Sequence, residues 1–209
     1  MVVRPDTRPD SGAPVQPAEF REAVATMATA RLRPEVLCEE MPAPQRIAPY
    51  SSALSADVTV EGVDLGTGRL VVLHDPAGND AWDGTFRCVA YVRADTEPET
   101  DSDDSRVFCA AAWSWLAEAL DSHGAAYGAI SGTVTRVVTE SFGCMADEAP
   151  TSQVEIRASW TPLAVDDAPL DLRPHVEAWS QVLCSAAGLP PVPEGVAVMP
   201  SRRGQRGLP

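Results

Sequence analysis

Residues 69–94 read RLVVLHDPAGNDAWDGTFRCVAYVRA, two apolar runs joined by a polar connection rich in Asp, Asn, Gly and Pro. The first run, RLVVLHD, is typical of a short buried strand. In the second run, Phe86, Cys88, Ala90 and Val92 occupy every other position, and this period of two predicts a strand with one buried face. The connection is too short for the crossover helix that parallel strands need, so we predict two antiparallel neighbours.

The chain on either side of this pair extends the same pattern. LSADVTVEG, at residues 54–62, alternates in the same way, and with an expected turn at Gly66–Gly68 it completes a three-stranded antiparallel meander. A short extended piece is expected at residues 35–40. Helical spacing predicts helices over residues 17–32, 105–124 and 172–188, and alternation predicts strands near residues 131–141 and 152–160.

This order of elements predicts the fold class. It contains too few helices for a parallel sheet, in which every strand needs a crossover. We therefore predict a single α+β domain over residues 18–188, with an antiparallel sheet of about five strands and three main helices packed on one face. Residues 1–17 are expected to be a disordered tail, residues 95–104 a solvated acidic loop, and residues 189–209 a Pro/Arg-rich tail.

Composition excludes several kinds of protein. The formal net charge is −14, and all 16 basic residues are arginines. Without lysine, the chain cannot form a Walker phosphate loop, a Schiff base, a pyridoxal-phosphate enzyme or a protein kinase. Its acidity repels nucleic acid at long range, so we expect no DNA binding, and RNA binding would need a local arginine patch.

Location and cofactor content are also predicted from composition. No apolar run approaches the roughly 20 residues of a membrane span, and the N-terminus lacks the apolar core of a secretory signal. We therefore expect a cytoplasmic protein with no membrane association. The five cysteines are widely spaced and never form a C-x-x-C pair, which indicates buried thiols and predicts neither a disulfide framework nor a zinc site. No cofactor is predicted.

Several segments together carry a family resemblance. They are RPE, APQRIAPYS, GRLVVLHDPAGNDAWDGTFRCVAYVRAD, SGTVTR, SQVEIRASWTP and AGLPP, spread over residues 20–191. In them the chain resembles the actinobacterial family called domain of unknown function 3000. The resemblance implies no established activity, catalytic residue or cofactor. Members of that family are often encoded near a ribonuclease-D-like exonuclease, which implies a link to RNA metabolism.

The polar connection holds one group of candidate site residues. His74 stands beside Asp75, and Asp83 follows Trp82. A histidine with nearby carboxylates can serve as an acid–base pair or hold a metal ion. The same segment is typical of a hairpin turn, because Asp-Pro and Asp-Gly steps favour turns and Asp side chains bond their own backbone. We expect the turn, with His74 replaceable beside a strand end and Asp83 supporting the turn.

The predicted strands hold a second group. Arg87, Arg93, Arg136 and Arg157 lie on them with Tyr91, and arginines beside an aromatic ring can bind phosphate or single-stranded RNA. The alternative is cross-strand pairing with carboxylates on a solvated face, which suits an acidic protein and is favoured. Trp82 is expected to pack over a strand edge, although tryptophan on a loop is also typical of binding hot spots.

A non-enzymatic interaction or regulatory module is the predicted function, because no catalytic motif with specific spacing is present. Its expected partner is an unidentified protein or RNA. The alternative is a hydrolase or metal-dependent enzyme centred on His74, Asp75 and Asp83; no catalytic residue and no metal ligand is assigned. The candidate binding residues are His74, Asp75, Trp82, Asp83, Arg87, Tyr91, Arg93 and Arg157.

Overall fold

The computed structural model describes residues 16–96, 105–166 and 168–191. Within them, six strands form one antiparallel sheet in the order β1-β2-β3-β4-β6-β5. The strands are β1 (Val36–Glu40), β2 (Tyr50–Val60), β3 (Val63–Asn79), β4 (Gly84–Thr96), β5 (Tyr127–Thr139) and β6 (Thr151–Pro162). The helices are α1 (Ala18–Met27), α2 (Ser105–Ser122) and α3 (Arg173–Ala186), with a short 3-10 helix η1 (Gly143–Met145) between β5 and β6. The predicted α+β class and antiparallel sheet are confirmed.

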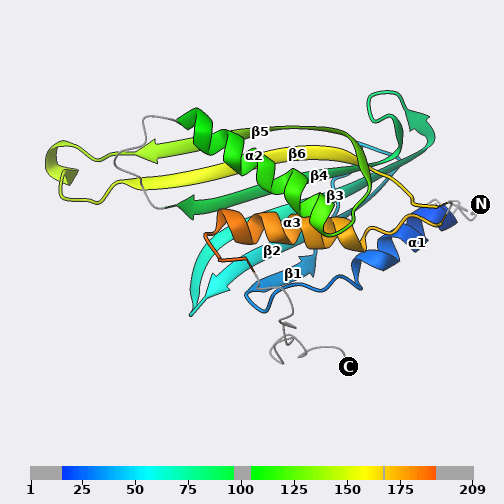
Figure 1. Ribbon diagram of the computed structural model, residues 1–209, viewed down its shortest axis with the longest axis horizontal. Helices are drawn as coiled ribbons and strands as arrows, with labels where there is room; N and C mark the ends of the chain where they lie inside the picture. Colours follow the sequence, from blue (N-terminus) through cyan, green and yellow to red (C-terminus); the bar gives the residue numbers. More distant parts are fainter. Residues whose placement is uncertain (1–15, 97–104, 167, 192–209) are drawn as a thin grey trace, which may run out of the picture.

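The core lies between the sheet and the helices. α2 and α3 run side by side across one face, and α1 lies toward one end of α3 (Figure 1). Alternate strand residues such as Leu70, Val72 and Val92 point into this layer and are buried, as the period of two predicts. Trp160 of β6 and Trp179 of α3 fill it. No described element covers the opposite face of the sheet (Figure 1), and side chains at its middle, such as Arg69, Arg93 and Arg157, are exposed.

The turn between β2 and β3 corrects one expectation. It lies at Glu61 and Gly62, whose φ angles of 51° and 85° are both in the left-handed region that a two-residue hairpin turn requires. The prediction of a turn at Gly66–Gly68 is wrong, because both glycines lie inside β3. A Cβ on Gly68 would lie 3.0 Å from the ring of Trp179. This glycine permits close packing of α3 on the sheet.

Two strands differ in extent from the prediction. The extended piece expected at residues 35–40 is β1, which pairs with β2 from Val36 opposite Val58 to Glu40 opposite Leu54 and brings the sheet to six strands. β3 continues through the polar segment as far as Asn79, which lies opposite Gly84. The predicted turn is therefore present but is confined to residues 80–83.

The predicted tails and acidic loop lie largely outside the described residues, since residues 1–15, 97–104 and 192–209 are not among them. Among the helices that are described, none is long and apolar enough to cross a membrane.

Candidate functional site

The open face of the sheet carries a row of arginine and tyrosine side chains. The strand register places Arg69 of β3 opposite Tyr91 of β4, and Tyr91 opposite Arg157 of β6. Neighbouring strands are about 4.8 Å apart, so this row spans roughly 10 Å across the middle of the sheet. Arg93 follows Tyr91 by two positions and therefore points to the same face. All three arginines are exposed, so three arginine residues neighbour Tyr91 on this face of the sheet.

Tyr91 is held in place by Glu155 and Arg157. Its hydroxyl donates a hydrogen bond to Oε2 of Glu155 at 2.9 Å, and the guanidinium carbon of Arg157 lies 5.6 Å from the centre of its ring. Arg157 also forms an ion pair with Glu155. Burial, reinforced by the Glu155 carboxylate, raises the pKa of Tyr91. The phenol therefore stays protonated at neutral pH and keeps a fixed orientation.

Arg69 and Arg93 are less engaged than Arg157. In the part of the chain that the structure describes, neither forms a hydrogen bond or an ion pair. Arg93 stands opposite Glu155 in the register, but Tyr91 and Arg157 already bind that carboxylate. Both free guanidinium groups are thus available to an anionic ligand. Arg69 was not among the residues predicted from the sequence. The signal that could have found it is the predicted antiparallel pairing of β3 with β4, which places Arg69 opposite Tyr91.

Arg87 lies on the same face but has a structural role. It is only 7% exposed. Its guanidinium donates to the Ala129 carbonyl at 2.8 Å and to the hydroxyls of Ser159, Thr161 and Ser131 at 2.7, 3.1 and 3.3 Å. Burial lowers the pKa of Arg87. Because these acceptors belong to β5 and β6, Arg87 ties three strands together, and we leave it out of the proposed binding surface.

His74 lies in the core instead of on the hairpin surface. Its ring is fully buried, 4.2 Å from the ring centre of Phe86 and 5.7 Å from that of Phe20 on α1. Nδ1 donates to the Thr85 carbonyl at 3.1 Å. Nε2 lies 3.0 Å from a Glu19 carboxylate oxygen, close enough for an ion pair but not aligned for a hydrogen bond. The expectation that His74 packs only beside a strand end is corrected: the ring joins α1 to the β3–β4 hairpin.

The other predicted hairpin residues build the turn and do not converge on His74. The Asp75 carboxylate accepts a backbone N–H two residues further on at 3.0 Å. Asp83 has a φ of 54°, in the left-handed region that Asp tolerates. Trp82 is half-exposed, and its carbonyl accepts a hydrogen bond from the Thr161 hydroxyl. Among the described residues, no three His, Cys, Asp or Glu side chains are grouped as a metal site requires.

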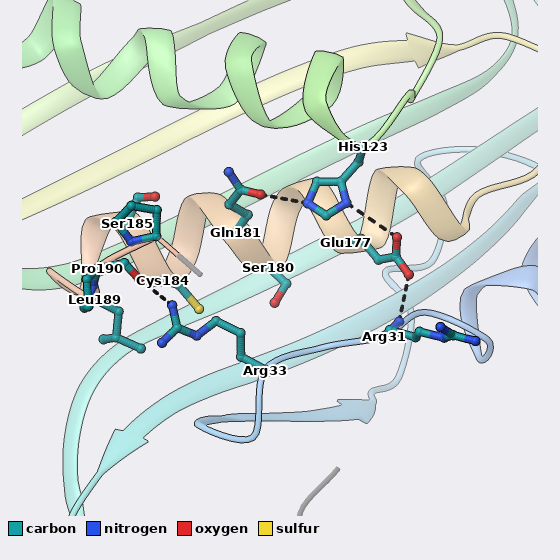
Figure 2. Close-up of a pocket in the computed structure, with 11 residues that line it drawn as sticks. Arg31, Arg33, His123, Glu177, Ser180, Gln181, Cys184, Ser185, Leu189 and Pro190 are labelled. Atoms are coloured by element: carbon teal, nitrogen blue, oxygen red, sulfur yellow. Dashed lines mark hydrogen bonds and ion pairs between the residues drawn. The ribbon is translucent and has the colours of Figure 1, made fainter. Parts of the chain in front are cut away.

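A pocket of about 280 Å³ opens on the helix side, between α3, the end of α2 and the segment that precedes β1 (Figure 2). Nε2 of His123 lies 2.7 Å from the Gln181 side-chain oxygen, and Nδ1 lies 3.5 Å from the Glu177 carboxylate. Glu177 also accepts the backbone N–H of Arg31 at 2.8 Å. Both ring nitrogens of His123 are thus engaged by α3, so the ring is not placed to activate the nearby Ser180 hydroxyl. The group braces α2 against α3.

The described residues therefore define an α+β protein with one arginine-bearing open sheet face and no nucleophile–base pair in the pocket beside α3. The chain matches the model of the family described as "Protein of unknown function (DUF3000)" over residues 16–197, and it belongs to that family. No curated protein and no solved structure matches the chain.

Proposed function

We propose that the protein is a non-enzymatic binding module whose open sheet face binds single-stranded RNA. The observation that carries this proposal is the placement of Arg69, Arg93 and Arg157 around Tyr91 on a face that no described element covers. Two of these arginines have neither a hydrogen bond nor an ion pair among the described residues. In a chain with 30 acidic and 16 basic residues, leaving two arginines unpaired on one face favours an external anion.

The chemistry of the group suits a nucleotide chain. Guanidinium groups bind phosphate oxygens through paired N–H donors, and an aromatic ring provides a surface on which a base stacks. Modules that bind single-stranded RNA on a sheet place such aromatic residues on its middle strands. Tyr91 is on β4, which has β3 on one side and β6 on the other. The row of Arg69, Tyr91 and Arg157 therefore offers alternating contacts to phosphate and base.

Single-stranded RNA fits this face better than two other anions. A DNA duplex is read by an element that enters a groove, whereas this surface is the open side of a sheet. An acidic protein segment would pair with the arginines but would leave the stacking surface of Tyr91 unused. The net charge of −14 opposes any polyanion at long range, so we expect modest affinity that depends on these local contacts. We also propose a cytoplasmic location, where the five free cysteines would be stable as thiols.

Fluorescence anisotropy with a labelled single-stranded oligouridine tests the proposal. We expect Arg69→Gln, Arg93→Gln and Arg157→Gln each to weaken binding about five- to tenfold and to reduce the slope of log affinity against log salt by about 0.7. The matched control is Arg21→Gln, because Arg21 is an exposed arginine on α1, on the helix side of the sheet. It should bind RNA as the wild type does.

Two further arms separate RNA from other partners. Tyr91→Phe keeps the ring and should retain most of the affinity, whereas Tyr91→Ala should lose about 1–3 kcal/mol of base stacking. An oligoglutamate peptide of equal length provides the comparison with an acidic protein. Equal affinity for the peptide and the RNA, or unchanged RNA binding in the three arginine variants, would show that the proposal is wrong.

A further inference from the structure

The two edges of the sheet are built differently. β1 has 5 residues, ends in Glu39 and Glu40, and is followed shortly by Pro42. Short length, charge and proline are features that prevent an edge from pairing with another chain. β5, at the other edge, has 13 residues, no proline and a single charged residue, Arg136. The guanidinium of Arg136 lies over the ring of Phe108 on α2, 4.8 Å from its centre, so its charge is directed toward α2 and does not prevent another strand from pairing with β5.

β5 has a strand partner on one side only. Among the described strands it pairs with β6 alone, so the backbone donors and acceptors of its other side have no strand to bind. The register shifts between Gly128 and Ser131, but from Ser131 to Thr139 the pairing with β6 is unbroken. That stretch is about 30 Å of regular edge. An unprotected edge of this length is a template for a further strand.

Exposed apolar side chains border this edge. Val137 and Val138 on β5 are 48% and 52% exposed. The β5–β6 hairpin projects past the other strands (Figure 1), and near its tip Phe142 and Met145 are 77% and 54% exposed. Large apolar groups at such exposure are costly in a monomer when they gather in one region. Their position beside a free strand edge indicates an interface.

α2 extends the same uncharged surface. The helix lies over β5, and a Cβ on Gly132 would lie only 2.7 Å from the ring of Trp113. Every residue of α2 between Val107 and Ala117 is uncharged, including its exposed and half-exposed positions. Since the whole chain carries a net charge of −14, this strip is where two copies can approach with little electrostatic repulsion.

We propose that the protein forms a homodimer in which the β5 strands of two copies pair antiparallel, with α2 and the β5–β6 hairpin packing beside them. A second copy fits because the strand is self-complementary, as a two-fold interface requires. The strand pair alone is too small for a stable dimer, which buries at least about 1,200 Å², so α2 and the hairpin supply the remaining apolar area. The two-fold axis stands perpendicular to the sheet and places both open faces on the same side.

Symmetry makes the pairing testable at single residues. Directly opposed residues in an antiparallel pair point to the same face of the sheet. Under the two-fold axis, the only registers that satisfy this condition place one β5 residue directly opposite its own copy. One position in the regular stretch must therefore have its Cβ within about 5.5 Å of the same atom in the second copy.

Analytical ultracentrifugation of the full chain over a wide concentration range is the first experiment. We expect a reversible dimer for the wild type, and at least about a tenfold rise in the dissociation constant for Val137→Lys and for Phe142→Ser, since edge lysine and loss of apolar area oppose pairing. Leu37→Lys is the matched control, because Leu37 is a similarly exposed residue (56%) on the β1 edge. It should dimerise as the wild type does.

Cysteine cross-linking is the second experiment and does not depend on any disruptive variant. In a Cys144→Ser background, single cysteines are placed at position 131 and at each position from 133 to 139 and oxidised; position 132 is left as glycine because a side chain there would clash with β6. We expect one position on β5 to form an intermolecular disulfide rapidly and its neighbours to do so slowly, while a cysteine at Leu37 and the parent protein do not. A wild type that stays monomeric at every concentration, or a dimer that cross-links at none of the β5 positions, would overturn the proposal.

Discussion

The indole N–H of Trp160 donates a hydrogen bond to Nδ1 of His175 at 3.0 Å, and both side chains are buried. The bond joins β6 to the first turn of α3. It requires an unprotonated Nδ1, because a proton on that atom would face the indole N–H. Burial lowers the pKa of His175 to about 4, although the Asp171 carboxylate acts in the opposite direction.

We expect this histidine to make stability depend on pH. The unfolded chain binds a proton on His175 near pH 6.5, whereas the folded chain binds it near pH 4. Between these values the unfolded state holds more protons, so the free energy of unfolding falls as the pH falls. The total loss is roughly 3 kcal/mol and is complete by about pH 4.

Urea unfolding at two pH values checks the His175 prediction. Between pH 7 and pH 5, wild type should lose roughly 2 kcal/mol more than His175→Gln, since glutamine can accept the indole N–H but does not titrate. All other residues are the same in the two proteins, so the pH dependence that they contribute cancels in the comparison. An equal loss in the two proteins would contradict the assignment.

Arg87 and Arg93 lie on the same strand and face, but we expect their substitutions to act differently. Arg87→Gln leaves the Ala129 carbonyl and the Ser159 and Thr161 hydroxyls without their donor, and the Thr161 hydroxyl is buried. It should lower the free energy of unfolding by about 2–3 kcal/mol. Arg93 is exposed, so Arg93→Gln should change stability by no more than about 0.5 kcal/mol. Chemical unfolding of the two variants measures the difference, and similar losses would place Arg87 at the surface.

This contrast shows what could be predicted from the sequence. Alternation placed Arg87, Tyr91 and Arg93 on one face and predicted the antiparallel sheet, because a period of two depends only on local geometry. Which of these arginines is buried depends on Ser159 and Thr161 of β6, which are distant in sequence and become neighbours only through the strand order. Local composition cannot predict that these distant residues surround the Arg87 guanidinium with hydrogen-bond acceptors.

Two other residues show the same limit. His74 stands beside turn residues in the sequence, yet α1 folds over it and buries its ring against Phe20. Gly68 is a residue type typical of turns, yet it lies inside β3, where the Trp179 ring of α3 occupies the space that a side chain would fill. In both cases the cause is a helix that packs from far along the chain. The sequence pattern predicts the strands and their polar face, but it does not predict which strand residues the helices contact and bury.

His74 should therefore be costly to replace. His74→Ala removes a buried ring that stacks on Phe86 and Phe20, and we expect a loss of about 3 kcal/mol from the cavity and the lost contacts. Asp75→Ala should cost only about 0.5–1.5 kcal/mol, since it removes one local hydrogen bond in the turn. Thermal or urea unfolding ranks the two variants. A larger loss for Asp75→Ala than for His74→Ala would indicate that His74 lies on the hairpin surface and not in the core.

At Gly132 the strand β5 lies close to Trp113 of α2, and this close approach yields the last prediction. A Cβ there would meet the Arg157 carbonyl oxygen, the Ala158 Cα at 2.9 Å and the Trp113 ring at 2.7 Å. The first two contacts are backbone atoms of β6, which cannot move away without breaking the sheet. We expect Gly132→Ala to destabilise the protein by more than about 2 kcal/mol through overpacking, and to increase the solvent exposure of Trp113 as α2 lifts from β5.

The matched control for Gly132 lies four residues earlier in the same strand. A Cβ on Gly128 would meet only the Leu163 side chain at 3.7 Å, an ordinary contact. Gly128→Ala should therefore change the free energy of unfolding by no more than about 0.5 kcal/mol. Urea unfolding and acrylamide quenching of tryptophan fluorescence measure both effects. If the two variants are equally stable, α2 does not pack on β5 at Gly132. In that case α2 and β5 would not form the continuous uncharged surface described above.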